Sequence, residues 1–306
     1  MDKEGECSSE EYDFNHPERG KAVIINNIKF EERTEQEPRR GAAKDSDNLK
    51  DTFRLLGFDV ELHTNLKTTE MLSVLQQAAR EDHSKRDCFI CAISSHGYED
   101  EQIQQKKSQW SSKTIKMERS DLICGTDGVL PLYLITDMFT EKNCPTLIKK
   151  PKLFFIQACR GDMLAENVEV TDGLMEDEVD LGAHHIFMED EIDWGGHYIF
   201  AQNIPIYRDY FLAYSTPPGF LSFRRGNKGS WFVISLCDVL KTGYKDTDLQ
   251  AMLTKVNHQV AYEFSANSPR DRLMHGRHIV PWTASMLTKE LFFRPKTDEG
   301  KLIKFV

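Results

Sequence analysis

The sequence predicts an α/β fold with a mostly parallel central sheet of about six strands and helices on both faces. Two runs of bulky apolar residues, at 88–93 and 153–156, have the length and composition of strands that are buried on both faces. Segments with apolar residues at helical spacing separate such runs along the chain. Strands that alternate with helices in this way are typical of a parallel sheet covered on both sides.

The individual elements follow in order from the same patterns. The first strand is expected over residues 21–26, and residues 58–62 alternate as a second strand should. Between them, residues 47–56 have helical spacing and end at Gly57, a good helix stop. The remaining helices are expected over residues 69–82, 133–139, 231–241 and 249–264, and the remaining strands over residues 88–93, 153–156, 211–215 and 279–286.

Three segments show neither the apolar pattern of a strand nor the apolar spacing of a helix. Residues 1–20 are short and polar, and we expect a disordered tail there. Residues 31–40 are charged and include Pro38, which predicts a loop. Residues 99–119 are polar with clusters of Gln and Lys, and we expect an inserted surface loop.

The composition limits the class of protein. Of 306 residues, 40% are hydrophobic and 29% are charged, which is the mix of an ordinary soluble globular protein. No run of 18 apolar residues occurs, so no membrane span is expected. The first residues are charged where a signal peptide needs an apolar core. The seven cysteines are odd in number and scattered, which favours a reducing compartment and a cytoplasmic protein.

The charge is unevenly distributed. The formal net charge of -10 argues against a protein that binds nucleic acid by neutralising phosphates. Residues 162–193 contain twelve acidic side chains and no Lys or Arg, so the rest of the chain is close to neutral. Neither glycine-rich phosphate-binding motif, G-x-G-x-x-G or G-x-x-x-x-G-K-[ST], occurs, which weakens a nucleotide-binding interpretation of the fold.

A cysteine and a histidine follow the two buried strands. Cys159 comes after residues 153–156 and His96 after residues 88–93, so neighbouring parallel strands would place both at one edge of the sheet, where ligands bind. A free thiol titrates near pH ~8.5, and a nearby imidazolium favours its thiolate. The pattern predicts Cys159 as nucleophile and His96 as its acid–base partner. The backbone N–H groups of Gly97 and Cys159 are candidate donors to an oxyanion.

The residues around this pair carry a specific resemblance. Gln157-Ala158-Cys159-Arg160-Gly161 matches the pentapeptide of the caspase family, and Ser95-His96-Gly97 resembles the family's histidine motif. Further resemblances run from about Lys21 to Phe293 and include residues 81–86, 150–153, 213–216, 229–232 and 285–291. The chain resembles a caspase of the short effector type, a cysteine endopeptidase that cuts proteins after aspartate.

The resemblance implies an organisation and a biological role. It divides the chain into a short N-terminal peptide (1–20), a large catalytic subunit (21–172), an acidic linker (173–200) and a small subunit (201–306). It implies a caspase-like sheet that dimerises into a larger continuous one, with the strand at 280–286 at the two-fold axis. The expected partners are protein substrates with Asp at the cleavage position, a second cleaved chain and inhibitor-of-apoptosis proteins. The expected role is apoptotic execution, without metal or cofactor, nucleic acid or membrane.

The resemblance also implies a pocket for the substrate aspartate. Arg39 and Arg224 match the two arginines of that pocket, with Gln157 between them and Ser95 nearby. Arginine suits this task because its planar fork pairs bidentately with a carboxylate.

The neighbouring subsites involve residues 221–231. We expect Ser222 to pair its backbone with the substrate as an added strand, and Leu221, Phe223 and Trp231 to line adjacent subsites. Common effector caspases carry larger aromatic residues at the positions of Leu221 and Phe223, and a neutral residue at Arg225. We therefore expect Arg225 to favour an acidic substrate residue four positions before the cut.

Two stretches of the acidic segment look like substrates of the expected activity. Residues 169–172 are followed by the small Gly173, and residues 177–180 resemble an effector-caspase consensus. Proteolysis concentrates in exposed polar loops. We expect cleavage after Asp172 and after Asp180 to free the ends of the two pieces, so that their substrate loops assemble.

Three alternatives remain open. One is a catalytically silent caspase relative that acts as a scaffold, against which the intact catalytic pair and pocket arginines argue. A second is an enzyme of the related Arg/Lys-cutting families, whose pockets need acidic walls. The third is an initiator caspase that lacks its recruitment domain, which the short N-terminal peptide supports little. The group that orients His96 is not identifiable from the sequence, although a backbone carbonyl near Glu37 is a candidate.

Overall fold

The computed structural model describes residues 10–106, 114–164, 177–179, 208–226, 228–267 and 274–296. Its centre is a six-stranded sheet in the order β12-β9-β7-β3-β1-β2, with parallel neighbours except for β12, which is antiparallel to β9. The strands are β1 (Glu18–Asn26), β2 (Asp59–Thr64), β3 (Arg86–Ser94), β7 (Lys152–Gln157), β9 (Tyr210–Tyr214) and β12 (Trp282–Ser285). The prediction of a mostly parallel sheet of about six strands is confirmed.

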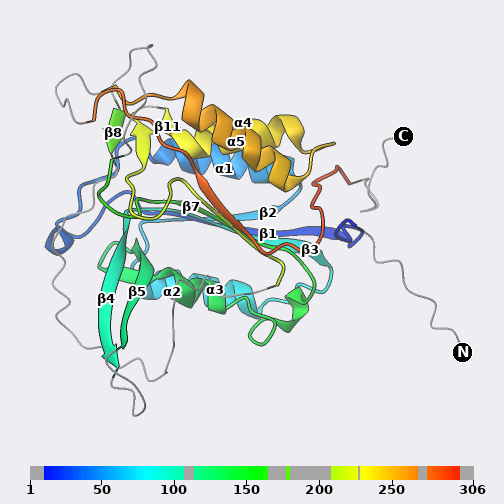
Figure 1. Cartoon of the computed structure of the whole chain (residues 1–306). Coiled ribbons are helices and arrows are strands. Elements are labelled where there is room, and N and C mark those ends of the chain that lie inside the picture. The colour runs from blue at the N-terminus through cyan, green and yellow to red at the C-terminus, as the bar shows by residue number, and fades with distance from the viewer. Residues whose placement is uncertain are drawn as a thin grey trace, which may run out of the picture.

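Helices cover both faces of this sheet (Figure 1). One face carries α1 (Ala43–Leu55), α4 (Trp231–Gly243) and α5 (Leu249–Glu263), and the opposite face carries α2 (Thr68–Arg80) and α3 (Leu132–Asp137). Single 3-10 turns occur at Glu32–Thr34 and Pro145–Leu147. Among the helices in the described part of the chain, none has the length and apolarity needed to cross a membrane.

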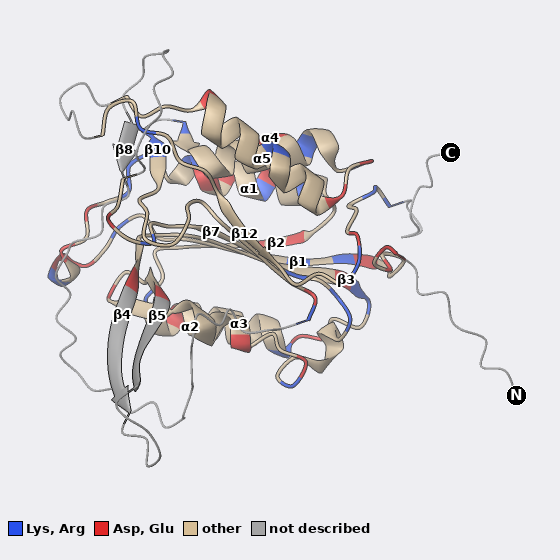
Figure 2. Ribbon diagram, viewed as in Figure 1, with Lys and Arg blue, Asp and Glu red and all other residues tan. Residues whose placement is uncertain are grey.

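The central strands are apolar throughout because their side chains alternate between two buried clusters. In β1, Ala22 and Ile24 belong to the cluster under α1, α4 and α5, whereas Val23 and Ile25 belong to the cluster under α2 and α3. Strands β3 and β7 divide in the same way. Burial on both faces produces a continuous apolar run in the sequence. In Figure 2 the middle of the sheet is accordingly tan, whereas charged residues lie mainly at strand ends and on helices.

The expectation of a surface loop at 99–119 is wrong. Strands β4 (Gly97–Lys106) and β5 (Thr114–Cys124) pair antiparallel along their whole length, and β6 (Val129–Pro131) pairs with β5. An antiparallel ribbon satisfies its backbone groups between its own strands, so a polar sequence can form it. The ribbon extends away from the central sheet (Figure 1), and its first residue directly follows His96.

A third, smaller sheet has no counterpart among the expected elements. It has the order β11-β10-β8, with β8 (Asp177–Val179), β10 (Phe223–Arg225) and β11 (Gly229–Ser230) paired antiparallel. Strand β8 comes from the segment expected to be a linker, and β10 from the segment expected to bind substrate.

The parts of the chain on either side of the acidic segment share one sheet. Strand β7 precedes that segment and pairs along its length with β9, which follows it. Strand β12 is shorter than the strand expected at 279–286, and it is a half-buried edge strand. The sheet is therefore continuous across the expected boundary between the large and small subunits.

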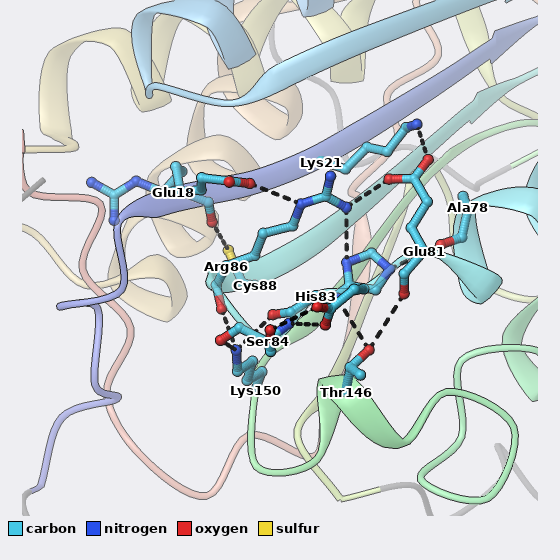
Figure 3. A network of polar contacts seen from close by, with 12 residues as sticks. Glu18, Lys21, Ala78, Glu81, His83, Ser84, Arg86, Cys88, Thr146 and Lys150 are labelled. Carbon is cyan, nitrogen blue, oxygen red and sulfur yellow. Dashed lines mark hydrogen bonds and ion pairs between the residues drawn. The ribbon is translucent and has the colours of Figure 1, made fainter.

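A polar network joins two of the sequence motifs where β3 and β7 begin (Figure 3). The ammonium group of Lys150 donates hydrogen bonds of 2.7, 2.9 and 2.6 Å to the backbone carbonyls of His83, Ser84 and Arg86. The Arg86 guanidinium also pairs with Glu81 at 2.7 Å. These contacts hold the turn that leads into β3 against the segment that leads into β7.

Replacing Lys150 with Met keeps the aliphatic stem and removes all three donors. We expect Lys150→Met to lower the free energy of unfolding by about 2–3 kcal/mol, because half-buried carbonyls lose hydrogen bonds from a charged group. Urea unfolding followed by circular dichroism measures the change. The exposed neighbour Lys149 is the control, and Lys149→Met should stay within about 0.5 kcal/mol of the wild type. Equal stability of the two variants would contradict the role given to Lys150.

Candidate active site

The carboxyl ends of β3 and β7 are level with each other, because Ser94 pairs with Gln157 as the last pair of the ladder. His96 and Cys159 each lie two residues beyond that pair. The backbone N–H of Ser95 donates to the carbonyl of Gln157 at 3.0 Å, so the two segments stay in contact past the ladder. The expected catalytic pair therefore comes from adjoining strand ends.

Gly97 marks a close approach between these two segments. A Cβ atom at Gly97 would lie 2.8 Å from the carbonyl oxygen of Leu122, 2.9 Å from Cβ of Ala158 and 3.0 Å from the carbonyl oxygen of Cys159. Only a residue without a Cβ fits between these atoms. The backbone of Gly97 is thus held directly against the nucleophile segment.

The His96 ring is oriented by one hydrogen bond and one ring contact. Its Nε2 donates to the carbonyl oxygen of Glu37 at 2.8 Å, and its plane packs on Phe30 with 4.8 Å between ring centroids. A carbonyl oxygen only accepts, so Nε2 carries the proton of the neutral ring and Nδ1 carries the lone pair. The contact confirms the candidate carbonyl near Glu37.

The Cys159 thiol lies against the segment that leads into β10. It is 2% exposed, and the backbone N–H of Ser222 donates to its sulfur at 3.2 Å. Four backbone hydrogen bonds join the residues after Cys159 to this segment: Arg160 N–H to Phe220, Met163 N–H to Gly219, Gly219 N–H to Arg160, and Leu221 N–H to Met163. The nucleophile and the expected substrate-binding segment form one connected unit.

Arg39 is buried at the carboxyl ends of β1 and β3. Its guanidinium donates to the side-chain oxygen of Asn26 at 3.2 Å, to the carbonyl of Asn27 at 2.9 Å and to the hydroxyl of Ser94 at 3.0 Å. Ser94 therefore contacts Arg39, whereas Ser95 was the serine expected near the two pocket arginines. The Ser95 hydroxyl instead donates to the carbonyl of Cys124 at 2.6 Å.

Arg224 is also buried, and a carboxylate accompanies the two arginines. The Nε of Arg224 donates to the carbonyl of Arg40 at 2.6 Å. Asp45 accepts hydrogen bonds from the backbone N–H of Ser230 at 2.8 Å and from its hydroxyl at 2.6 Å. Burial raises the pKa of Asp45, while the hydrogen bonds from Ser230 and the charges of Arg39 and Arg224 act to lower it. The charges of both arginines therefore act on the buried carboxyl group of Asp45.

The other residues expected to line the substrate pocket are buried against neighbouring side chains. Gln157 donates from Nε2 to the hydroxyl of Ser222 at 2.8 Å. Leu221 and Phe223 are buried. Trp231 is fully buried, and its ring stacks on Phe223 with 4.8 Å between centroids.

Arg225 lies beside this aromatic cluster. It is half-buried, and its guanidinium lies over the ring of Phe264 at 4.8 Å from the centroid. Phe264 in turn packs on Trp231 at 5.5 Å. The charge is thus held at the end of β10 by an aromatic surface.

A further cluster next to the nucleophile has no counterpart in the sequence analysis. Arg160 donates from Nε and Nη2 to the two carboxylate oxygens of Asp121, at 2.9 and 3.0 Å. Its guanidinium lies over the rings of Tyr214 and Trp282, at 4.1 and 4.9 Å from their centroids. Burial, followed by the Asp121 charge, raises the pKa of Tyr214 well above its usual value. The sequence signal for this cluster is the position of Arg160 directly after Cys159. Asp121 gives no such signal, because it lies just after the loop expected at 99–119.

Two expected residues, Asp172 and Asp180, lie outside the described residues. The six cysteines that the structure describes are free thiols. In the same part of the chain, no group of three or more His, Cys, Asp or Glu residues is arranged to hold a metal ion.

The arrangement contains the groups that covalent catalysis requires. A thiol and an imidazole come from adjoining strand ends, next to a glycine backbone. Two buried guanidinium groups, those of Arg39 and Arg224, act on one buried carboxyl group, that of Asp45.

Comparison with known proteins gives consistent results. A family model described as "Caspase domain" matches residues 19–292. Caspase-7 of Gallus gallus is 38% identical over 283 residues, which span 92% of this chain and 80% of that protein. Caspase-3 of Mesocricetus auratus is 36% identical over 282 residues, 92% of this chain and 86% of that protein. The crystal structure of caspase-1 from Spodoptera frugiperda has a TM-score of 0.73 and 32% sequence identity, and the match covers 94% of this chain and 96% of that one.

The tight packing at Gly97 generates a prediction with an internal control. Gly97→Ala should lower the free energy of unfolding by about 1–3 kcal/mol, because its methyl group must displace backbone atoms of Leu122 and Cys159. Gly128 has nothing within 4 Å of its Cβ position, so Gly128→Ala should change stability by less than about 1 kcal/mol. Chemical denaturation of the two variants compares them directly. Indistinguishable midpoints would show that the two segments are not packed as described.

Proposed function

Because the chain belongs to the caspase family and is a cysteine endopeptidase, we propose that Cys159 and His96 carry out cleavage after aspartate. The observation that carries this proposal is the level pairing of Ser94 with Gln157, which brings the segments of His96 and Cys159 together. The hydrogen bond from His96 Nε2 to Glu37 supports it, since it leaves Nδ1 as the basic nitrogen.

The reaction proceeds through an acyl-enzyme. The Cys159 thiol gives its proton to Nδ1 of His96, and the sulfur attacks the carbonyl carbon of the substrate aspartate. The backbone N–H groups of Gly97 and Cys159 stabilise the oxyanion. The peptide C–N bond breaks as His96 protonates the leaving amine. His96 then takes a proton from water, which attacks the thioester; the C–S bond breaks and releases the new carboxylate.

Selectivity for aspartate follows from the buried arginines. Arg39 and Arg224, both buried, bind the substrate carboxylate with Gln157 between them. Leaving one partner of such a buried pair without the other costs about 3–5 kcal/mol. At about 1.4 kcal/mol per tenfold, this corresponds to at least about 10²–10³ in preference for aspartate over a neutral residue.

The substrate binds as an added strand on β10. Ser222 offers backbone groups next to Cys159, and Leu221, Phe223 and Trp231 form the neighbouring subsites. Arg225, at the far end of β10, selects an acidic residue four positions before the cut.

The proposal extends to the activation of the protein by cleavage and to its assembly into a dimer. Cleavage after Asp172 and Asp180 leaves one piece with the large subunit (21–172) and a second piece, from residue 181, with the small subunit (201–306). Two cleaved chains dimerise through the edge strand β12. The similarity to caspase-7 and caspase-3 over about nine-tenths of the chain supports a cytoplasmic effector protease of apoptosis. Inhibitor-of-apoptosis proteins are the corresponding regulatory partners.

Replacing the nucleophile tests the activity and the processing together. Cys159→Ala should reduce turnover of a fluorogenic Asp-Glu-Val-Asp reporter by at least about 10³-fold, because the acyl-enzyme cannot form. Cys144→Ala removes another buried thiol and should retain activity within a few-fold. Intact-mass spectrometry should find chains ending at Asp172 or Asp180 in the wild type, and one uncut chain in Cys159→Ala. Full activity of an uncut wild-type chain would refute the proposed activation.

The role of Arg225 is tested by substrate profiling. Arg225→Met keeps the aliphatic contact with Phe264 and removes the charge. We expect the ratio of kcat/KM for reporters with Asp and with Ala four positions before the cut to fall by about two- to fivefold, the value of one partly exposed charge pair. Preference for aspartate at the cleavage position should not change. A wild-type enzyme without acidic preference at the fourth position would exclude this role.

A further inference from the structure

The two arginines of the proposed aspartate pocket come from distant parts of the chain. Arg39 lies between β1 and α1, and acceptors at the ends of β1 and β3 hold its guanidinium. Arg224 lies in β10, on the other side of the acidic segment. Because both guanidinium groups bind the same carboxylate, the fold must fix β10 relative to the segment that carries Arg39.

The backbones of these two segments are in direct contact. Nε of Arg224 donates to the carbonyl oxygen of Arg40 at 2.6 Å. A Cβ atom at Gly41 would lie 1.5 Å from the carbonyl oxygen of Gly226, so a larger residue would have to move the backbone. The segment that carries Arg39 therefore packs against the turn between β10 and β11.

A buried carboxyl group extends this contact from the turn to β11. Asp45 lies in the first turn of α1 and is fully buried. It accepts hydrogen bonds from the backbone N–H of Ser230 at 2.8 Å and from the Ser230 hydroxyl at 2.6 Å. Ser230 pairs with Arg224 in the ladder between β10 and β11. Asp45 therefore holds the residue directly opposite Arg224.

The two residues of β11 are adapted to this carboxyl group. Ser230 is the N-cap residue of α4, a position where a serine side chain usually accepts a hydrogen bond from the backbone of the first helical turn. In the described structure Ser230 makes no such capping bond, and its hydroxyl donates to Asp45 instead. At Gly229, a Cβ atom would lie 2.5 Å from Oδ1 of Asp45. Strand β11 thus exchanges a helix cap and a side chain for contact with Asp45.

Asn26 connects the same end of α1 to the other arginine. Its side-chain oxygen accepts from the Arg39 guanidinium at 3.2 Å, and its Nδ2 donates to the carbonyl oxygen of Ala42 at 2.7 Å. Ala42 is the N-cap residue of α1, one helical turn before Asp45. Hydrogen bonds and this single turn of helix therefore connect Arg39 to the strand pair that carries Arg224.

We propose that Asp45 is a positioning residue that, through Ser230, fixes Arg224 relative to Arg39 so that the two guanidinium groups converge on one substrate carboxylate. This inference rests on the proposed function and adds to it a residue that does not touch the substrate. Aspartate and glutamate carry the same charge and differ by one methylene, so a pocket distinguishes them by the positions of its donors. A displaced Arg224 should therefore weaken this distinction.

The test measures selectivity in the purified full-length enzyme. Each variant is assayed with fluorogenic Asp-Glu-Val-Asp and Asp-Glu-Val-Glu reporters, and the ratio of the two kcat/KM values is compared with that of the wild type. A loss of folded enzyme lowers both values equally and leaves the ratio unchanged. We expect Asp45→Ala to lower the ratio about tenfold, the value of one methylene in a fitted pocket.

The conservative variant separates position from charge. Asp45→Asn should keep the ratio within about threefold of the wild type, because its Oδ1 still accepts from the Ser230 N–H and its Nδ2 can donate to the Ser230 hydroxyl. Ser230→Ala removes only the hydroxyl bond and should lower the ratio about two- to fivefold. This milder variant decides the question if Asp45→Ala does not fold.

Asp209→Ala is the matched control. Asp209 is also buried and accepts two hydroxyl hydrogen bonds, from Tyr12 and Thr288 at 2.7 Å each. It directly precedes β9, at the end of the sheet opposite the catalytic pair. Its substitution should lower stability and leave the selectivity ratio unchanged.

An unchanged ratio in Asp45→Ala, or in Ser230→Ala where Asp45→Ala does not fold, overturns the inference. An Asp45→Asn ratio as low as that of Asp45→Ala overturns it too, as does an equal fall in Asp209→Ala. In each case the proposed function still stands, provided that the wild type cuts the Asp-Glu-Val-Asp reporter. If the wild type does not cut that reporter, the proposed function fails and the inference fails with it.

Discussion

The parallel ladder between β3 and β7 is the constraint on which the site depends. It ends with Ser94 opposite Gln157, and His96 and Cys159 each follow two residues after that pair. A shift of one residue would turn every side chain of one strand to the other face of the sheet, and would exchange its partners between the two buried clusters. The Lys150 network holds the opposite ends of the same strands. The position of Cys159, the proposed nucleophile, relative to His96 is therefore determined by the core.

The proposed pocket for aspartate contains charged groups whose burial has a high free-energy cost. Arg39 is fully buried, where an uncompensated guanidinium would destabilise the fold. The Asn26 side chain, the Asn27 carbonyl and the Ser94 hydroxyl accept its hydrogen bonds, and its charge acts on the buried carboxyl group of Asp45. Because these partners are already in place, the proposed binding of a substrate carboxylate would require little reorganisation of the donors.

The sequence predicted the central sheet and its helices, since strands buried on both faces leave long apolar runs. It did not predict the β4–β5 ribbon, whose stability comes from backbone pairing rather than from an apolar face. Strands β8, β10 and β11 are two or three residues long, too short to show periodicity. His96 and Cys159 were identifiable because each follows a strand. Asp45, Ser94 and Asp121 were not, because their contacts join residues far apart in the sequence.

The pairing of β7 with β9 has a consequence for the chain once it is cut between them. Cleavage anywhere from residue 165 to 207 breaks one covalent connection and leaves every strand pair of the six-stranded sheet in place. The two fragments would then be held together by the core alone, and their association would obey mass action. Refolding, first order for the intact chain, would become second order in fragment concentration. Dilution after denaturation would then inactivate the cut enzyme far more readily than its precursor.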